Sequence, residues 1–152
     1  MTARMMMGMR LLVLLLCMAT APLARADDAA KATAAAQKIL QLLSTNQVSL
    51  IWSGHLSSFW WEHLTANNVS KEQFLSNTSL GRAQLGALFS AKVIDVNFMA
   101  FDPNMPAVKD VYSINFVSTY ASGKFYERVV VVKDRDGEFK WHGIWGAPAP
   151  KD

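Results

Sequence analysis

The chain has 152 residues, 51% of them hydrophobic, and a formal net charge of +3. This length has room for one domain, because domains cluster at about 100–150 residues. The excess of 15 basic over 12 acidic side chains comes entirely from Arg4, Arg10 and Arg25 in the first 26 residues. The rest of the chain is neutral, so the composition excludes the basic surface by which proteins bind nucleic acids.

The first 26 residues have the order of a secretory signal. Arg4 and Arg10 precede the apolar run Leu11–Ala19, and the small-residue site Ala24-Arg25-Ala26 follows it. The run is about half as long as the roughly 20 residues that a membrane-spanning helix needs. We therefore predict cleavage between Ala26 and Asp27, export to the periplasm, and no stable membrane anchor on the mature chain.

Cys17 is the only cysteine, and it belongs to the predicted signal. The mature domain is then expected to contain neither a disulfide nor a thiol nucleophile. Lipidation of Cys17 is an alternative, although Leu15 and Leu16 stand where a lipoprotein signal has small residues.

Three helical segments are predicted in the first half of the mature chain. Residues 27–45 are rich in alanine and begin with two aspartates, which favour a helix N-terminus. Residues 48–64 place apolar side chains at helical spacing, and Gly54 is expected to divide them. Ser70 and Gln73 form a capping-box pattern that opens a third helix, which is predicted to end near Gly86.

Beyond Lys92 the hydrophobic period changes to the alternation of strands. Four strands are predicted around residues 94–98, 112–116, 125–132 and 139–145, with turns at 102–106, 121–123 and 134–137. Helices followed by an antiparallel meander predict an α+β fold, with the N-terminal helices packed on a curved four-stranded sheet. The domain is placed at 27–147 and a short proline-containing tail at 148–152.

The alternation also assigns side chains to the two faces of the sheet. Asp95 is predicted to point to solvent, and its apolar neighbour Ile94 to the opposite face. Trp141 and Trp145 are predicted to share one face and to form an aromatic ladder over the helices.

Spaced residues along the mature chain match the pattern of a protein family. They are Trp52, Val69-Ser70-Lys71-Glu72, Arg82-x-x-Leu85-Gly86, Tyr112 to Val117, Glu127 in a valine-rich strand, and Phe139-Lys140-Trp141-His142-Gly143. In this order they resemble the bacterial exported proteins of "domain of unknown function 4019". The resemblance implies a cone-shaped fold similar to nuclear transport factor 2 and ketosteroid isomerase, and it implies no established activity. Phe139 and Ile144 depart from the Trp and Tyr of the family pattern.

Glu127 and Arg128 are the charged residues of a β-rich run in which both faces are mostly apolar. One of these two charges is therefore expected to be partly covered. A buried carboxylate needs a partner, and Arg82 is an isolated charge on an otherwise apolar helix. We predict an Arg82–Glu127 pair, with a structural role or, alternatively, a role in ligand recognition.

No catalytic motif is present, since the sequence has no Gly-x-Ser-x-Gly, Ser-x-x-Lys, phosphate loop or dinucleotide fingerprint. No cofactor and no metal are expected, because His55 and His63 are two helical turns apart and His142 is in a distant strand. A candidate pocket is assigned to aromatic and imidazole side chains, namely Trp52, Trp60, Tyr112, Tyr126 and His142.

An aromatic-rich domain without a catalytic constellation predicts a non-enzymatic periplasmic protein. It is expected to bind a small ligand or a protein in a groove between the first helices and the sheet, and a homodimer is a further expectation. Two alternatives are open. One is a ketosteroid isomerase-like isomerase or hydrolase that uses Glu127 or His142. The other is a periplasmic inhibitor or immunity protein that binds through residues 101–108.

Overall fold

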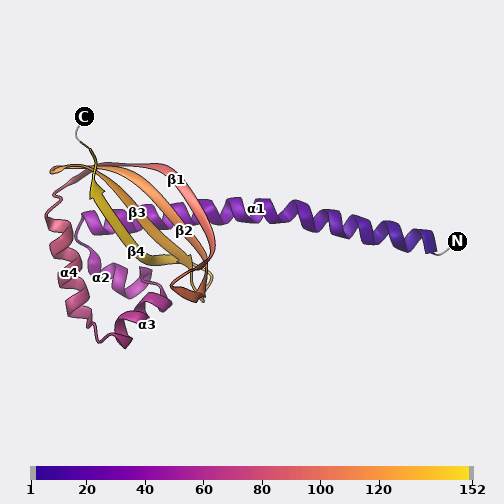
Figure 1. The fold of residues 1–152 in the computed structure, drawn as a ribbon, viewed down its shortest axis with the longest axis horizontal. Helices are drawn as coiled ribbons and strands as arrows, with labels where there is room; N and C mark the ends of the chain where they lie inside the picture. The colour runs from indigo at the N-terminus through magenta and orange to yellow at the C-terminus, as the bar shows by residue number, and fades with distance from the viewer. Residues whose placement is uncertain (1–2, 151–152) are drawn as a thin grey trace.

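The computed structural model describes residues 3–150, with side chains described from Leu23 onward. In chain order its elements are α1 (Ala3–Ser44), α2 (Val48–Leu50), the π-helix η1 (Ile51–His55), α3 (Ser58–Ala66), α4 (Lys71–Ala83), β1 (Leu88–Asp102), β2 (Met105–Tyr120), β3 (Gly123–Lys133) and β4 (Phe139–Pro148). Helices precede strands, so the predicted α+β class is confirmed (Figure 1). Cys17 and the apolar run of the predicted signal lie outside the residues whose side chains are described.

The strands form one antiparallel sheet in the order β1-β2-β3-β4. Each strand pairs with the next along the chain, and the short connections at 103–104, 121–122 and 134–138 coincide with the predicted turns. The predicted meander is therefore present. β1 begins at Leu88, earlier than predicted, because pairing with β2 continues where the alternation of hydrophobic residues is no longer regular.

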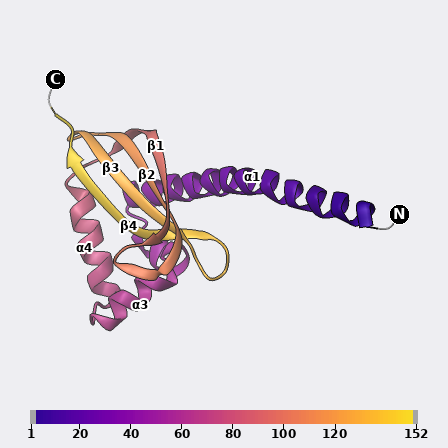
Figure 2. The same ribbon diagram turned by 45° about the vertical axis from the view of Figure 1, so that its right-hand side comes forward.

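The helix α1 covers one face of the sheet, crosses the strands and continues beyond the sheet (Figures 1 and 2). Its buried side carries Ala32, Ala36, Ile39 and Leu43 at helical spacing. They pack against inward side chains of the strands, which include Ile114, Phe116, Val129 and Val131. Burying each large apolar side chain contributes about 1.5–3 kcal/mol, so this interface stabilises the domain. None of the described helices is both long and apolar enough to span a membrane.

The predicted break within residues 48–64 is present, but it falls at Leu56 and Ser57 instead of Gly54. The chain leaves η1 so that Leu56 forms a parallel bridge with Trp141. The Ser57 N–H then donates to the Trp141 carbonyl at 2.9 Å. These contacts cover part of the free edge of β4, and a continuous helix could not make them.

Local sequence signals set both ends of α4. The Ser70 Oγ accepts from the Gln73 N–H at 3.2 Å, and the Gln73 Oε1 accepts from the Ser70 N–H at 2.8 Å, so the predicted capping box is present. The helix ends at Ala83, and Gly86 has a φ of +74°, which favours glycine. A Cβ on Gly86 would also lie 2.9 Å from the Ala121 Cβ, so glycine is required where the chain turns into β1.

A β-bulge in β4 changes which side chains face the helices. The Val130–Gly143 pair is followed by a Val131–Trp141 pair, so His142 is the extra residue. Trp141 therefore points into the core and is 5% exposed, whereas Trp145 lies on the opposite face and is 60% exposed. The predicted ladder of Trp141 and Trp145 is wrong, because the alternation reverses at the bulge.

A second irregularity lies in β1, where the pairing shifts between Val93 and Asp95. Ile94 is the residue between them, and its side chain is exposed instead of turned toward the helices. Asp95 points to solvent, as predicted. The bulge thus places an apolar and an acidic side chain next to each other on the open face of the sheet.

Candidate functional site

The predicted contact between Arg82 and Glu127 is present between α4 and the inner face of the sheet. The Arg82 Nη1 donates to the Glu127 Oε1 at 2.6 Å, and the side chains are 13% and 2% exposed. The Tyr120 hydroxyl completes what we call the buried triangle (Arg82, Tyr120, Glu127). It accepts from the Arg82 Nη2 and donates to the Glu127 Oε2 at 2.8 Å. Both carboxylate oxygens are therefore held by partners.

The surroundings of the buried triangle keep the Tyr120 hydroxyl as a donor and the Glu127 carboxylate as an acceptor. Burial raises the pKa of Tyr120, although Arg82 opposes the shift, so the hydroxyl stays protonated and continues to donate. Gly146 lies opposite Glu127 on β4, and a Cβ there would be in ordinary van der Waals contact with the Glu127 Cγ at 3.5 Å, so the carboxylate side chain packs closely against this strand. A general base needs an oxygen that can reach a substrate proton, whereas the Glu127 side chain is 2% exposed and each of its oxygens is already hydrogen-bonded within the triangle.

The bulge in β4 directs His142 into a second polar cluster. The Ser57 Oγ lies 3.1 Å from the Nδ1 of His142, and the Asp102 Oδ2 lies 3.2 Å from its Nε2. Because an ionised carboxylate only accepts, we assign the ring proton to Nε2 and the Ser57 hydroxyl as the donor to Nδ1. Burial lowers the pKa of His142, with partial opposition from Asp102. The ring is therefore neutral at neutral pH.

Serine, histidine and aspartate in a hydrogen-bonded row are also the residue types of a hydrolase triad. Here, however, Ser57 is 0% exposed, and its oxygen accepts the Trp60 N–H at 3.1 Å as the N-cap of α3. A substrate carbonyl has no access to this oxygen. The row instead joins three segments, which are the start of α3, the β1–β2 turn at Asp102, and β4.

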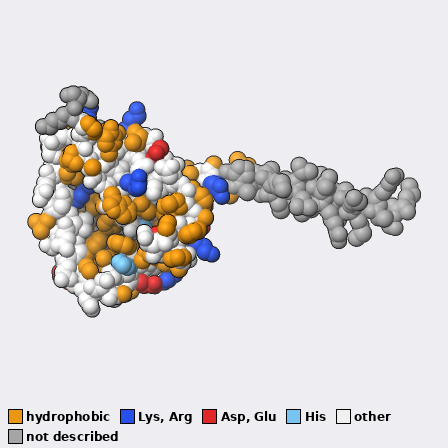
Figure 3. All heavy atoms as spheres, in the orientation of Figure 1, with side chains coloured by type: hydrophobic (Ala, Val, Ile, Leu, Met, Phe, Trp, Pro, Cys, Tyr) orange, Lys and Arg blue, Asp and Glu red, His pale blue; other side chains and the backbone are white. Residues whose placement is uncertain are grey.

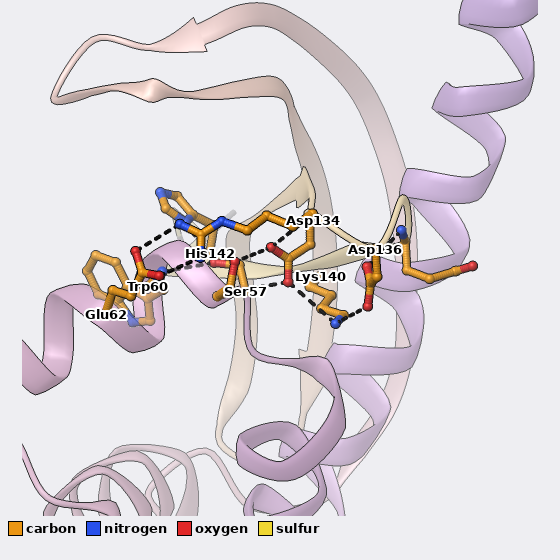
Figure 4. Close-up of polar contacts among 10 residues, drawn as sticks. Ser57, Trp60, Glu62, Asp134, Asp136, Lys140 and His142 are labelled. Carbon is orange, nitrogen blue, oxygen red and sulfur yellow. Dashed lines mark hydrogen bonds and ion pairs between the residues drawn. The ribbon is translucent and has the colours of Figure 1, made fainter.

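The β3–β4 turn carries a further network beside this row (Figure 4). The buried Asp134 accepts from the Ser58 N–H at 3.0 Å and from the Ser58 hydroxyl. Lys140 lies 3.4 Å from Asp134 and 2.5 Å from Asp136. Burial alone would raise the pKa of Asp134, but its hydrogen bonds outweigh burial and the pKa is lowered. A charged carboxylate at the N-terminus of α3 stabilises the helix, so this network fixes the turn against it.

A cleft of about 560 Å³ lies between α1, η1 and the β3–β4 turn. Its ionisable lining consists of Lys31, Lys38, His55, Asp136, Glu138 and Lys140. Burial lowers the pKa of His55, and Lys38 and Lys140 lower it further. The cleft lies between the first helices and the sheet, where a groove was predicted. Acidic and basic groups nearly balance in it, so it has no strong preference for either sign of ligand charge.

The face of the sheet away from α1 carries a groove of about 400 Å³. Four of its residues lie in register across the strands, namely Asp95, Asn115, Arg128 and Trp145. Hydrogen bonds join the first three, which we call the open row (Asp95, Asn115, Arg128). The apolar lining includes Ile94, Tyr126 and Trp145, each about half exposed or more. Figure 3 shows hydrophobic side chains gathered over the strands, with isolated charged ones between them.

The residues assigned to the candidate pocket lie in several places. Trp60 and His142 meet, with the two rings edge-on and 5.5 Å between their centroids. Trp52 packs on Phe74 in the core, and Tyr112 is buried there as well. Tyr126 lies on the other side of the sheet and lines the groove. The structure thus brings two of these residues together and separates the other three, because the core fills the space between α1 and the sheet.

The histidines lie in three different surroundings. His63 stacks on Trp60, with 4.9 Å between the ring centroids, His55 lines the cleft, and His142 is buried in its row. Among the residues with described side chains, no three His, Cys, Asp or Glu side chains are grouped so that they could hold a metal ion.

A family model described as "Protein of unknown function (DUF4019)" matches residues 35–144. The chain belongs to the DUF4019 family. No curated protein and no solved structure matches it. The DUF4019 region runs from α1 into β4, so it contains the buried triangle, the open row and the row around His142. It ends one residue before Trp145.

Sequence reasoning missed Tyr120, Ser57 and Asp102. Tyr120 had a usable signal, because it has the same parity in β2 as Tyr112 and Phe116, which face the core. Ser57 and Asp102 had none. They meet at His142 only because that residue is the extra one of a bulge, and Gly143, which can signal a bulge, does not show which residue is extra or what it contacts.

Proposed function

We propose that this DUF4019 protein is exported to the periplasm of a bacterium and works there as a non-enzymatic domain that binds a small ligand or a protein. Its contact surface is the groove on the open face of the sheet. The observation that carries the proposal is the exposed group of Trp145, Tyr126 and Arg128 on this face. Trp, Tyr and Arg dominate binding energy at interfaces, and exposed apolar patches mark interaction sites.

The polar groups that an enzyme would use are engaged inside the fold, which supports a binding role. Glu127 has both oxygens hydrogen-bonded, and Ser57 and His142 are buried and bonded to each other. The ketosteroid isomerase-like alternative would require one of these groups to face a cavity that admits a substrate. The groove instead presents exposed side chains that a partner can cover.

The start of the packed part of α1 supports the predicted export and cleavage. Residues 23–27 are exposed, and of these Arg25 lies over the Phe98 ring at 4.6 Å from its centroid. By contrast, Asp28 pairs with Lys133 at 2.9 Å and Ala32 is buried. Cleavage before Asp27 would therefore keep the contacts of the buried face of α1. The intact mass of the protein recovered from the periplasm tests this directly. A chain that begins at Asp27 is expected, and a lipid on Cys17 or a retained Met1 would contradict it.

We further propose that the arrangement is similar to nuclear transport factor 2. The support is the long helix α1 across the inner face of the sheet, with η1 and α4 in contact with it. We also propose that the protein partner can be a second copy of the chain, which would form a homodimer through the open face. Asp95 and Arg128 carry opposite charges in one row, so a twofold axis can place each opposite its partner in a second copy.

Site-specific photo-crosslinking in the exported, full-length protein tests the binding role. The crosslinker is placed at position 126, in the groove, and for comparison at position 61, where Trp61 is exposed on α3. We expect a discrete crosslinked species from position 126 that the Trp145→Ala variant loses, and none from position 61. Equal crosslinking from both positions would contradict the proposal, whereas no crosslinks from either position would exclude a protein partner and leave the small-ligand form, which the titration below tests. Crosslinks from position 101, where Phe101 is exposed, would instead favour the inhibitor alternative.

A further inference from the structure

The indole of Trp145, called the platform below, lies on the open face of the sheet. Its ring lies back over Gly143, and a Cβ on Gly143 would be 2.7 Å from the Trp145 Cη2 and 3.0 Å from its Cζ3. Only glycine leaves this space. The indole therefore packs against the strand, while most of the side chain remains open to solvent. A ring positioned before the ligand arrives loses little conformational entropy on binding.

The open row holds polar groups in line beside this platform. The Arg128 Nε donates to the Asn115 Oδ1 at 3.1 Å, and the Asn115 Nδ2 donates to the Asp95 Oδ1. Among the described residues, none accepts from the terminal nitrogens of Arg128 or donates to the Asp95 Oδ2. The row thus presents donors at one end and an acceptor at the other. With Trp145 it crosses three inter-strand spacings, roughly 14 Å.

These features restrict the chemistry of the ligand. A phosphate or carboxylate would bind Arg128 but would be repelled by Asp95. An acyl chain would cover both charged groups without offering either a hydrogen bond. A sugar ring has a face of C–H groups, which can stack on an indole, and a rim of hydroxyls that both donate and accept. Because Trp145 and the open row together span roughly 14 Å, a short chain of such rings, and not a single ring, satisfies the platform and both ends of the open row together.

We propose that the groove binds a neutral saccharide, stacked on Trp145 and hydrogen-bonded by Arg128 and Asp95. This inference rests on the proposed function, since it names the ligand of the same surface. The groove volume of about 400 Å³ is within the range of small-molecule sites. Asn115 is a positioning residue, because both of its amide atoms are engaged with its neighbours in the row.

Titration of the exported protein with three neutral trisaccharides tests the proposal. The probes are maltotriose, cellotriose and tri-N-acetylchitotriose, with inorganic phosphate and decanoate as ligands of the other two classes. We expect a saturable change in tryptophan emission and a calorimetric dissociation constant of about 1 mM or tighter for at least one trisaccharide. Neither phosphate nor decanoate is expected to give a response that depends on Trp145.

Calorimetry on variants locates the site, because Trp145→Ala removes the fluorescent reporter. Trp145→Ala is expected to weaken saccharide binding by about tenfold or more, and Trp145→Phe by less. Arg128→Gln and Asp95→Asn should each weaken it several-fold. The matched control is Trp61→Ala, which removes another exposed tryptophan far along the chain from the groove and should leave the affinity unchanged.

Three results would overturn the inference: no trisaccharide binds, binding survives Trp145→Ala, or the Trp145-dependent response is to phosphate or decanoate. If saccharides fail while position 126 still gives Trp145-dependent crosslinks, the ligand class is wrong and the binding role stands. If both experiments fail, the open face is not a contact surface and both proposals fall.

Discussion

The buried triangle and the open row use nearly the same side-chain chemistry in opposite surroundings. Each contains an arginine and a carboxylate from different elements, joined through a third polar residue on β2. Glu127 and Arg128 are adjacent in sequence, so the pleat of β3 alone decides which of them is buried. In the triangle every carboxylate oxygen has a partner, whereas the row ends in groups that have none among the described residues.

These surroundings give the two clusters different roles: the buried triangle contributes to stability, and the open row is available for binding. Removing charge from water is costly, and a buried ion pair is tolerated only when its remaining hydrogen bonds are satisfied. The triangle meets that condition at both Glu127 oxygens and at both terminal nitrogens of Arg82, while the Arg82 Nε is buried without a partner among the described residues. Losing one member therefore leaves an uncompensated buried group. An exposed ion pair contributes little to folding, with a median of about 0–1 kcal/mol. The row can therefore change without unfolding the domain, and its side chains are free to serve a partner.

The largest effect is expected from breaking the triangle at Arg82. Arg82→Met leaves Glu127 buried with only Tyr120 as a partner, and the free energy of unfolding should fall by about 3–5 kcal/mol. Urea unfolding measures this loss. The double variant Arg82→Met with Glu127→Gln removes the uncompensated charge and should recover much of it. A loss below about 1 kcal/mol in the single variant is what an exposed ion pair gives, and it would contradict the burial of this pair.

A smaller loss is expected when only the hydroxyl of the triangle is removed. Tyr120→Phe keeps the ring in the core but takes a hydrogen bond from each charged partner, so unfolding should become easier by about 1.5–3 kcal/mol. Tyr126→Phe is the matched control, because its hydroxyl lies on the exposed face and its loss should stay within about 0.5 kcal/mol. Equal losses from both variants would remove the distinction between the faces.

A pH-dependent effect is expected from His142, which belongs to neither the buried triangle nor the open row. Burial holds its pKa below the ordinary value of 6.5, so the unfolded chain binds the proton more readily than the folded one. The corresponding stability is complete above about pH 6.5 and declines as the pH falls toward the folded-state pKa. Urea midpoints between about pH 7.5 and 5.5 should fall less in His142→Gln than in the wild type.

The pKa of His55 is also lowered, mainly by burial. Protonation of His55 at low pH therefore also favours the unfolded chain, as it does for His142. His55→Gln is therefore measured in parallel. A wild-type slope that only His55→Gln reduces would show that His142 is not the buried neutral histidine described here.

The smallest effect on stability is expected at Gly143, where the change should be local. Gly143→Ala places a methyl group where the ring of Trp145 lies, so the indole must move off the strand. Tryptophan emission should shift to longer wavelength and acrylamide quenching should increase, while the fold is retained. Gly54→Ala meets nothing within 4 Å and should leave the emission unchanged. Identical spectra for the two variants would contradict the platform.

The sequence predicted those parts of the fold that depend on local signals. The capping box of Ser70 and Gln73 lies within one helical turn, and the hydrophobic period changes at the border between helices and strands. The partner of Glu127 was also predictable, because a carboxylate in an apolar strand needs a cation and Arg82 was isolated on an apolar helix. Tyr120 could have been added from its parity with Tyr112.

The parts that depend on bulges could not be predicted. One extra residue at His142 reverses the alternation in β4, which moves Trp145 from the helix-facing side to the open face. Gly143 inside the strand is a general signal of a bulge, but it does not tell which neighbouring residue is the extra one. The open row required the same kind of information, since Asp95 aligns with Asn115 only after the shift in β1. The groove was therefore missed, although Tyr126 was named as a pocket residue.

Arg82 and Arg128 lie on opposite faces of the sheet, the first stabilising the fold and the second available for binding, and one paired measurement tests this difference most directly. Arg82→Gln and Arg128→Gln make the same chemical change on the two sides of the sheet. In urea unfolding we expect Arg82→Gln to lose about 3–5 kcal/mol and Arg128→Gln to stay within about 0.5 kcal/mol of the wild type. Equal losses, or a larger loss for Arg128→Gln, would contradict the account.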